Sequence, residues 1–419
     1  MSDPSLLNIP YRFKAGTLYS QIPESGLGDF VVSRTTTPTA NRSTRVNAQG
    51  FIETVADNVP RLDYPLGGIA AGCPALLVEP AATNQIRNNT MVGAVAGTPG
   101  TLPTNHSTTL NGLTRTIVGV GSENGVDYID VQVSGTATGS SFVYLFETGT
   151  QIVAAQGQTW TNSMWMKQIA DVGGNRPAAR VTIYENTSGG VYLGEGSLSV
   201  ALTSSLTRFS FTRTLVNALT ARVIPAFQFF LNVGTTYNFT IRIGLPQMEL
   251  GSVATSVIPT TTAAITRGAE VVNKTGVSSL IGQTEGTVYM ELDMRNFVTN
   301  AMACFVSDGT GLNSISVQIF APPNSIRVGI SRLGVGQIDF IVPMPSGVNK
   351  VALGYAQNNV AIYLNGTSVA TSAVCLIPAT SRVDLGSRIG TGSYLNDRIR
   401  SLAIYPTRLT NAQLQALTT

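Results

Sequence analysis

Apolar and polar residues alternate in short runs along most of the chain. Phe209 and Phe211 would face one way while Arg208, Ser210 and Thr212 face the other, as in a strand with one buried side. Thr, Val, Ile and aromatic residues fill such runs, and Gly, Asn, Asp and Pro separate them. Helical periodicity is missing until the C-terminal end. The pattern predicts an all-β protein and favours sandwiches over barrels.

Two runs predict strands that bury aromatic side chains. Val223, Phe227, Phe229 and Leu231 share one face of a predicted strand. In residues 142–146, Phe and Tyr alternate with Val and Leu, so this strand is expected to be apolar on both sides and buried.

The C-terminal part carries clear local signals. Residues 360–364 and 367–370 predict two strands joined at Asn365-Gly366, a pair that tolerates the positive φ of a type I′ turn. Residues 400–405 predict a closing strand. Residues 410–413 (Thr-Asn-Ala-Gln) then fit a capping box for a short helix carrying Leu414 and Leu417.

Three regions differ in pattern. Residues 1–89 are rich in Pro, Thr and Asn, contain short strands such as residues 29–33, and lack the apolar density of an independent core. We expect an extended segment that partners order. Residues 90–262 have the densest strand pattern and end in a polar linker, and residues 270–419 form a second β unit. The expected fold is therefore an extended N-terminal segment followed by two β-sandwich (jelly-roll) domains.

The composition excludes several classes of function. Of 419 residues only 12% are charged, and the net charge of +3 provides no electrostatic footprint for nucleic acid or an anionic membrane. No apolar run is long enough for a membrane span, and no secretory signal is expected at the N-terminus. The single histidine, His106, excludes His-pair metal sites. It lies in a polar stretch and is expected to be an ordinary loop residue.

The three cysteines show no metal or redox spacing. Cys304 and Cys375 lie in apolar runs, and Cys73 is far from both in sequence. We expect buried free thiols at Cys304 and Cys375; the alternative is a disulfide between these two.

Several short motifs near the N-terminus occur in a familiar order. They are residues 44–47 (Thr-Arg-Val-Asn), 50–55 (Gly-Phe-Ile-Glu-Thr-Val), 58–64 (Asn-Val-Pro-Arg-Leu-Asp-Tyr) and 75–84 (Ala-Leu-Leu-Val-Glu-Pro-Ala-Ala-Thr-Asn). Together they resemble an N-terminal module of tailed-bacteriophage virion proteins, which are described as head fibres, head spikes or tail fibres.

Motifs in the other two regions resemble two kinds of sandwich. Residues 158–167, 206–211 and 247–260 are similar to a carbohydrate-binding-module jelly roll, and the last stretch resembles one that recurs at the end of such domains in phage fibres. In the C-terminal region the resemblance is to the laminin-G-like, concanavalin-A-like sandwich; its residues are 350–355, 360–366, 398–405 and 409–414.

The resemblance implies a structural protein of the virion, made in the host cytoplasm. Its first 89 residues would attach to capsid, neck or tail proteins, and its sandwiches would present a surface for host glycans. A homotrimer is expected by analogy with phage fibres. It is also expected because the N-terminal region lacks the apolar density to fold alone. Two alternatives stay open: a capsid or collar decoration protein without glycan binding, and a polysaccharide depolymerase.

One pair of carboxylates is a candidate for catalysis. Glu291 and Asp293 would share a face of a strand, as acidic residues do in the Glu-x-Asp-x-x-Glu pattern of concanavalin-like glucanases. Retaining hydrolysis needs a second catalytic carboxylate about 5 Å from the first, and here Asn296 stands at its position. We therefore expect no enzymatic activity.

No cofactor is expected to be required, but laminin-G-like sandwiches often hold calcium on oxygen donors. The candidate loop ligands are Asp308, Asp384, Asn396 and Asp397; ordinary turn chemistry explains the same residues.

Sugar binding would use exposed aromatic rings beside polar groups. Trp165 shares a face with Ser163 and Lys167, whereas Trp160 shares one with apolar Met164. Trp165 is therefore the better candidate for a stacking platform, although a tryptophan in a sandwich strand usually belongs to the core. Further candidates in the C-terminal unit are Tyr355, Tyr363 and Tyr394.

Overall fold

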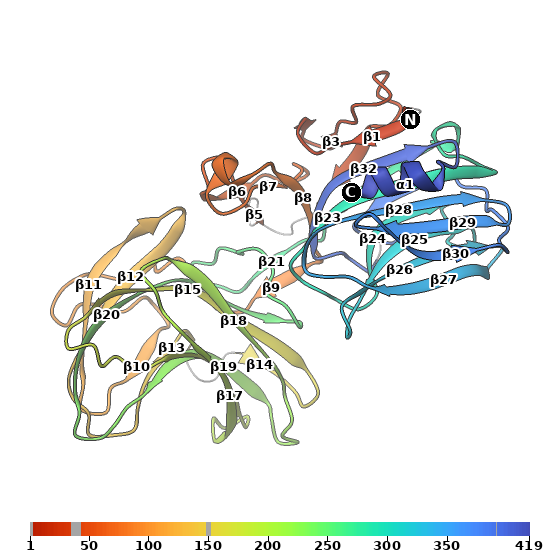
Figure 1. The fold of residues 1–419 in the computed structure, drawn as a ribbon. Helices are drawn as coiled ribbons and strands as arrows, with labels where there is room; N and C mark the ends of the chain where they lie inside the picture. Colours follow the sequence, from red (N-terminus) through yellow and green to blue (C-terminus); the bar gives the residue numbers. More distant parts are fainter. Residues whose placement is uncertain (1–2, 35–42, 148–151, 391) are drawn as a thin grey trace. The chain divides into compact units, whose positions relative to one another are not determined.

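The computed structural model describes residues 3–34, 43–147, 152–390 and 392–419 (Figure 1). Nearly all of the elements in these residues are strands, which confirms the all-β class. The chain divides into two compact units: Met1–Ala81 together with Gly268–Thr419, and Ala82–Arg267. We call them unit 1 and unit 2.

Unit 1 contains two large antiparallel sheets. The first consists, in spatial order, of β30 (Thr367–Ser372), β29 (Asn359–Leu364), β28 (Gly347–Ala356), β23 (Glu285–Met294), β32 (Asp397–Tyr405), β8 (Ala75–Val78) and β7 (Leu62–Asp63), with β1 (Leu6–Asn8) paired to β32. The second consists of β2 (Phe13–Lys14), β3 (Thr17–Leu18), β4 (Phe30–Ser33), β22 (Val271–Thr275), β31 (Arg382–Leu385), β24 (Ala301–Ser307), β25 (Ser314–Phe320), β26 (Ser325–Arg332) and β27 (Val335–Pro343). A separate hairpin pairs β5 (Ser43–Val46) with β6 (Ile52–Val55).

Strands from the N-terminal segment are built into both sheets of unit 1. Leu6 of β1 lies opposite Ile404 of β32, and Val32 of β4 lies opposite Val272 of β22. Leu6 and Val32 also belong to the hydrophobic core of the unit. The expected division at residue 89 is therefore corrected, because residues up to 81 complete the C-terminal sandwich instead of forming a part of their own. The first sandwich domain spans 82–267 instead of 90–262.

A second, smaller apolar cluster lies on the outer face of the first sheet. The helix α1 (Asn411–Thr418) packs there through Leu414 against Ala352 of β28 and Ala361 of β29, and Figure 1 shows the helix along these strands. As predicted, Thr410 caps the helix: its side chain accepts a hydrogen bond from the backbone N–H of Gln413. Among the described residues, no helix is long and apolar enough to cross a membrane.

Unit 2 is a sandwich of two antiparallel sheets. One consists of β10 (Ser107–Thr109), β13 (Ser141–Leu145), β19 (Arg222–Phe230), β16 (Ala179–Asn186) and β17 (Tyr192–Val200), with β14 (Ile152–Val153) paired to β19. The other consists of β11 (Thr114–Glu123), β12 (Val126–Thr136), β20 (Thr236–Leu250), β15 (Thr159–Asp171) and β18 (Thr207–Thr214). A short ribbon pairs β9 (Ala82–Asn84) with β21 (Ile265–Arg267).

Aromatic side chains fill the core of unit 2. Phe142, Tyr144, Phe227 and Phe229 are fully buried, and the rings of Tyr144 and Phe227 stack with centroids 5.1 Å apart. The buried face predicted for residues 223–231 is thus confirmed. The strand at residues 142–146 is buried on one side, whereas Val143 and Leu145 on its other side are half-buried.

The predicted hairpin at Asn365-Gly366 is present. Their φ angles are 48° and 78°, as a type I′ turn requires. The turn joins β29 to β30, so the local sequence signal was sufficient for this element.

Candidate functional site

The aromatic residues proposed as sugar platforms are mostly inside the fold. Tyr355 is fully buried and its hydroxyl donates to the Gly282 carbonyl, with 3.0 Å between the oxygens. Tyr363 is 8% exposed and Trp165 is 7% exposed. Tyr394 is half-buried, and its hydroxyl donates to the Gly390 carbonyl at 3.1 Å. The three buried rings present no open face for stacking, and Trp165 lies in a different unit from the tyrosines.

The residues considered for calcium do not converge. Asp308 lies in the turn after β24, Asp384 lies on β31, and Asn396 and Asp397 lie at the start of β32 in the other sheet. Among the described residues, no group of three or more His, Cys, Asp or Glu side chains is placed to hold a metal ion.

Protein donors already engage these carboxylates. Thr310, Gly311 and Asn313 donate hydrogen bonds to Asp308, and Arg382 forms an ion pair with Asp384 at 2.6 Å. Oδ2 of Asp397 accepts two backbone N–H groups. Calcium needs six to eight converging oxygens, so these residues do not fit it, and turn chemistry accounts for Asp308.

The candidate catalytic pair is engaged with arginines. Glu291 and Asp293 lie two residues apart on β23, as expected. Arg400 Nε lies 2.8 Å from Glu291 Oε1, and Arg295 Nη2 lies 2.8 Å from Asp293 Oδ2. Asn296, at the position of the missing carboxylate, donates its backbone N–H to Asp397. Both carboxylates are therefore held in ion pairs within the chain.

His106 lies in the loop before β10, as expected, but its ring is buried. It is 8% exposed and packs edge-on against Tyr144 and Phe146. Its Nε2 lies 2.8 Å from the Asn88 carbonyl, and its Nδ1 lies 3.0 Å from the Tyr144 hydroxyl. Because a carbonyl only accepts, Nε2 carries the proton and Nδ1 accepts from Tyr144. Burial lowers the pKa of His106 to about 4.

Cys304 and Cys375 are buried free thiols, as expected, and no disulfide joins them. Cys73 is exposed. Burial raises the pKa of the Cys304 thiol, so this group is poorly suited to act as a nucleophile.

The N-terminal motifs supply a buried network of charges in unit 1. Arg61 Nη2 lies 2.6 Å from Glu270 Oε2 and 2.7 Å from Glu79 Oε2. Arg34 Nη1 lies 3.0 Å from the other oxygen of Glu270. Asp63 Oδ2 forms a further ion pair with Arg398 Nη2 on β32, with 2.6 Å between the atoms. The motif residues therefore hold the N-terminal segment to the C-terminal sandwich.

Asn84, the last residue of the fourth N-terminal motif, contacts residues 247–260 inside unit 2. Asn84 Oδ1 accepts hydrogen bonds from the backbone N–H groups of Ile86 and Met248, and its Nδ2 donates to the carbonyl of Ile258. The side-chain oxygen Oε1 of Gln247 accepts from the Ile258 N–H at 2.7 Å. Asn84 thus links the point where the chain enters the sandwich to residues 247–258, near the point where it leaves.

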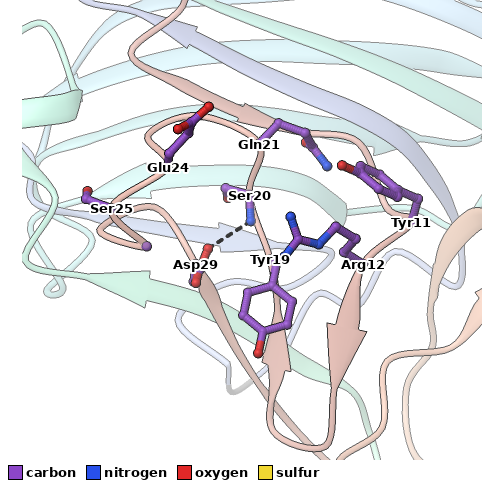
Figure 2. Close-up of a pocket in the computed structure, with 9 residues that line it drawn as sticks. Tyr11, Arg12, Tyr19, Ser20, Gln21, Glu24, Ser25 and Asp29 are labelled. Carbon is purple, nitrogen blue, oxygen red and sulfur yellow. Dashed lines mark hydrogen bonds between the residues drawn. The ribbon is translucent and has the colours of Figure 1, made fainter.

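An open pocket of about 670 Å³ lies in the N-terminal part of unit 1 (Figure 2). Its lining includes Tyr11, Arg12, Tyr19, Glu24 and Asp29. Figure 2 shows Tyr11 and Arg12 at one side and Glu24 and Asp29 at the other, with Ser20 between them. This volume is within the range of small-molecule sites, so the pocket is the candidate functional site of the described residues.

Hydrogen bonds within the chain hold the wall of the pocket. The Ser20 N–H donates to Asp29 Oδ1 at 2.9 Å, and the Ser20 hydroxyl donates to the Gly28 carbonyl at 2.6 Å. The Gln21 side chain exchanges two hydrogen bonds with the backbone of Ile9. The wall is therefore preformed, which lowers the entropy cost of binding.

The charged groups of the pocket face solvent. Arg12 and Glu24 are exposed, and Tyr11 is 54% exposed. The Arg12 guanidinium lies over the ring of Tyr19, with 5.5 Å to the centroid. In the part of the chain that the structure describes, no hydrogen bond or ion pair engages the side chains of Arg12 and Glu24. These groups remain available to a ligand.

The sequence does not predict this pocket. The available signal was the concentration of Tyr, Arg, Glu and Asp between residues 11 and 29. The segment has no regular periodicity, so spacing alone could not show which of these side chains would converge.

Comparisons with known proteins give only partial similarities. No protein-family model matches the chain, and no curated protein sequence matches it. Among solved structures, domain 4 of the extracellular arabinanase AbnA from Geobacillus stearothermophilus is 16% identical with a TM-score of 0.30; the match covers 36% of this chain and 73% of that one. Domains LG4-5 of the mouse laminin alpha1 chain are 12% identical with a TM-score of 0.23, covering 68% and 91%.

A phage structure is also similar in part. The tripod from the baseplate of bacteriophage Tuc2009 is 14% identical with a TM-score of 0.25, covering 64% of this chain and 98% of that one. Two longer glycosidase structures are matched over only 25% and 31% of their own length. Scores this low carry no conclusion about the role of this chain.

Proposed function

We propose that the chain is a structural protein of a tailed-bacteriophage particle, a head or tail fibre or spike, that works by binding host surface glycans and not by catalysis. The proposal of a virion role is supported by the four N-terminal motifs and their order. These motifs hold the N-terminal segment in unit 1, so the proposed attachment surface is part of a folded unit and not a separate arm.

The observation that favours glycan binding without hydrolysis is the engagement of the two carboxylates on β23. Glu291 and Asp293 each pair with an arginine, and Asn296 takes the place of a third acidic residue. Retaining glycosidases use two carboxyl groups about 5 Å apart that flank the scissile bond. Both carboxylates on β23 are held in arginine ion pairs and the third acidic position carries an amide, so this strand does not offer a free catalytic pair.

Mass spectrometry of gradient-purified particles of the phage that encodes the chain tests the virion role. We expect the chain to be present at a fixed copy number relative to the major capsid protein. Particles that infect normally and lack the chain would contradict the proposal.

A further inference from the structure

The pocket in Figure 2 carries both kinds of hydrogen-bonding group without a partner of their own. Arg12 supplies up to five donors in a planar fork. Glu24 and the second oxygen of Asp29 supply acceptors, because Ser20 engages only Oδ1 of Asp29 among the described residues. A ligand that fits must therefore both accept and donate hydrogen bonds at adjacent atoms.

The balance of charge restricts the class of ligand further. The pocket presents one cation, Arg12, and two carboxylates, Glu24 and Asp29. An anionic ligand would meet two like charges, and a cationic ligand would meet the guanidinium. A neutral hydroxyl group can accept from arginine and donate to a carboxylate, and hydrogen bonds to charged partners are the stronger ones.

The tyrosines add an apolar component. Tyr11 is more than half exposed at the edge of the pocket, and Tyr19 lies under Arg12. An aromatic ring offers a flat apolar face beside a polar edge, which matches the C–H face and the hydroxyl edge of a pyranose ring. The volume of about 670 Å³ is sufficient for one or two such rings.

We infer that this pocket binds a neutral hexopyranose unit, with Tyr11 against the face of the sugar, Arg12 donating to vicinal oxygens, and Glu24 and Asp29 accepting from hydroxyl groups. The inference rests on the proposed glycan-binding function and deepens it by naming a site and a class of sugar. It places that site in residues 11–29, outside the sandwich strands in which the sequence analysis expected it.

The test is saturation-transfer NMR on the full chain. The neutral probes are D-glucose, D-galactose and N-acetylglucosamine, and the charged probes are D-glucuronate and D-glucosamine. We expect at least one neutral sugar to bind saturably with a dissociation constant on the order of 1 mM, as for a ligand with few contacts. We expect the charged analogue of that sugar to bind about tenfold more weakly or worse.

Three variants locate the site. Arg12→Gln and Tyr11→Ala should each weaken binding about tenfold or more without changing the melting temperature, because both side chains are exposed. Tyr192→Ala is the matched control, since Tyr192 is 57% exposed and lies in unit 2. The inference is overturned if Tyr192→Ala abolishes binding or if the two pocket variants leave it unchanged. It is also overturned if no neutral sugar binds, or if a charged probe binds more strongly than every neutral one.

The same variants separate this inference from the proposed function. If host polysaccharide still binds to the Arg12→Gln variant with unchanged affinity, the pocket is not the glycan site but the chain remains a glycan-binding protein. If single sugars bind in the pocket and host polysaccharide does not bind, the inference about the pocket holds and the proposed glycan role fails.

Discussion

Burial determines what individual polar and aromatic residues of this protein can do. Tyr355 is a candidate sugar platform from the sequence and His106 an expected loop residue, but both are buried and use their polar atoms within the fold. Arg12 and Tyr11 have no distinguishing sequence context, yet they are exposed beside a cavity. A side chain that is fully satisfied inside the fold has nothing left to offer a ligand.

The buried His106 makes unit 2 sensitive to acid. Its pKa is about 4 in the folded state and near 6.5 in an unfolded chain, so the unfolded state binds more protons between these values. Stability is therefore lost as the pH falls from about 6.5 toward 4. On acidification from pH 7 to pH 5, we expect the titration of His106 to lower the free energy of unfolding by about 2 kcal/mol.

Urea unfolding of the wild type and of His106→Gln at both pH values measures this effect. The variant should be less stable at pH 7 but should lose about 2 kcal/mol less than the wild type on acidification. Equal losses in the two proteins would show that His106 titrates normally in the folded state.

The buried Arg61 should be essential for the stability of unit 1. Arg61→Met removes the cation that faces Glu270 and Glu79, and we expect a loss of about 3 to 5 kcal/mol because a buried charge is left without its main partner. The control is Arg45→Met, which breaks the more exposed pair with Glu53 and should cost at most about 1 kcal/mol. Similar denaturation midpoints for the two variants would rule out a dominant role for the Arg61 network.

Segments that are distant in the chain form joint elements, and this limits what the sequence could predict. The turn at Asn365 and the cap at Thr410 were predictable because all of their determinants lie within a few residues. The pairing of β1 with β32, or of β4 with β22, depends on residues more than 200 positions apart. The motifs were visible in sequence, but their contacts with distant strands were not.

The buried hydrogen bonds of Asn84 in unit 2 provide a test at the scale of elements. Asn84→Ala removes the acceptor of the Ile86 and Met248 N–H groups and the donor to Ile258. We expect unit 2 to lose about 2 to 4 kcal/mol, since buried donors are left unpaired. Hydrogen exchange should increase in β20, where Met248 lies.

Thr83→Ala is the matched control on the same strand. Thr83 makes a hydroxyl contact with Thr266 at the surface of the β9–β21 ribbon, so its loss should cost less than about 1 kcal/mol. If Asn84→Ala were no more destabilising than Thr83→Ala, the Asn84 hydrogen bonds would not be an important link between the two segments.

At the scale of the whole molecule, the all-β class was predictable from alternation but the grouping of its parts was not. The N-terminal segment looked too thin to fold alone, and this was one reason to expect a homotrimer. The structure removes that reason, because Leu6, Leu18 and Phe30 are buried in the core of unit 1 of the same chain. The candidate pocket was missed for a related reason, since it forms only where this irregular segment folds.

The homotrimer remains a prediction from the resemblance to phage fibres. Light scattering coupled to size exclusion should give about three times the mass of one chain, which is 44.1 kDa. A folded species at the mass of one chain would contradict it.

We propose that this protein binds host glycan without cleaving it. The most direct test adds the purified chain to the surface polysaccharide of the host bacterium and follows both bound protein and polymer length. We predict saturable binding with no change in polymer length, in the wild type and in Glu291→Gln alike. Shortening of the polymer that Glu291→Gln abolishes, or the absence of saturable binding, would contradict the account.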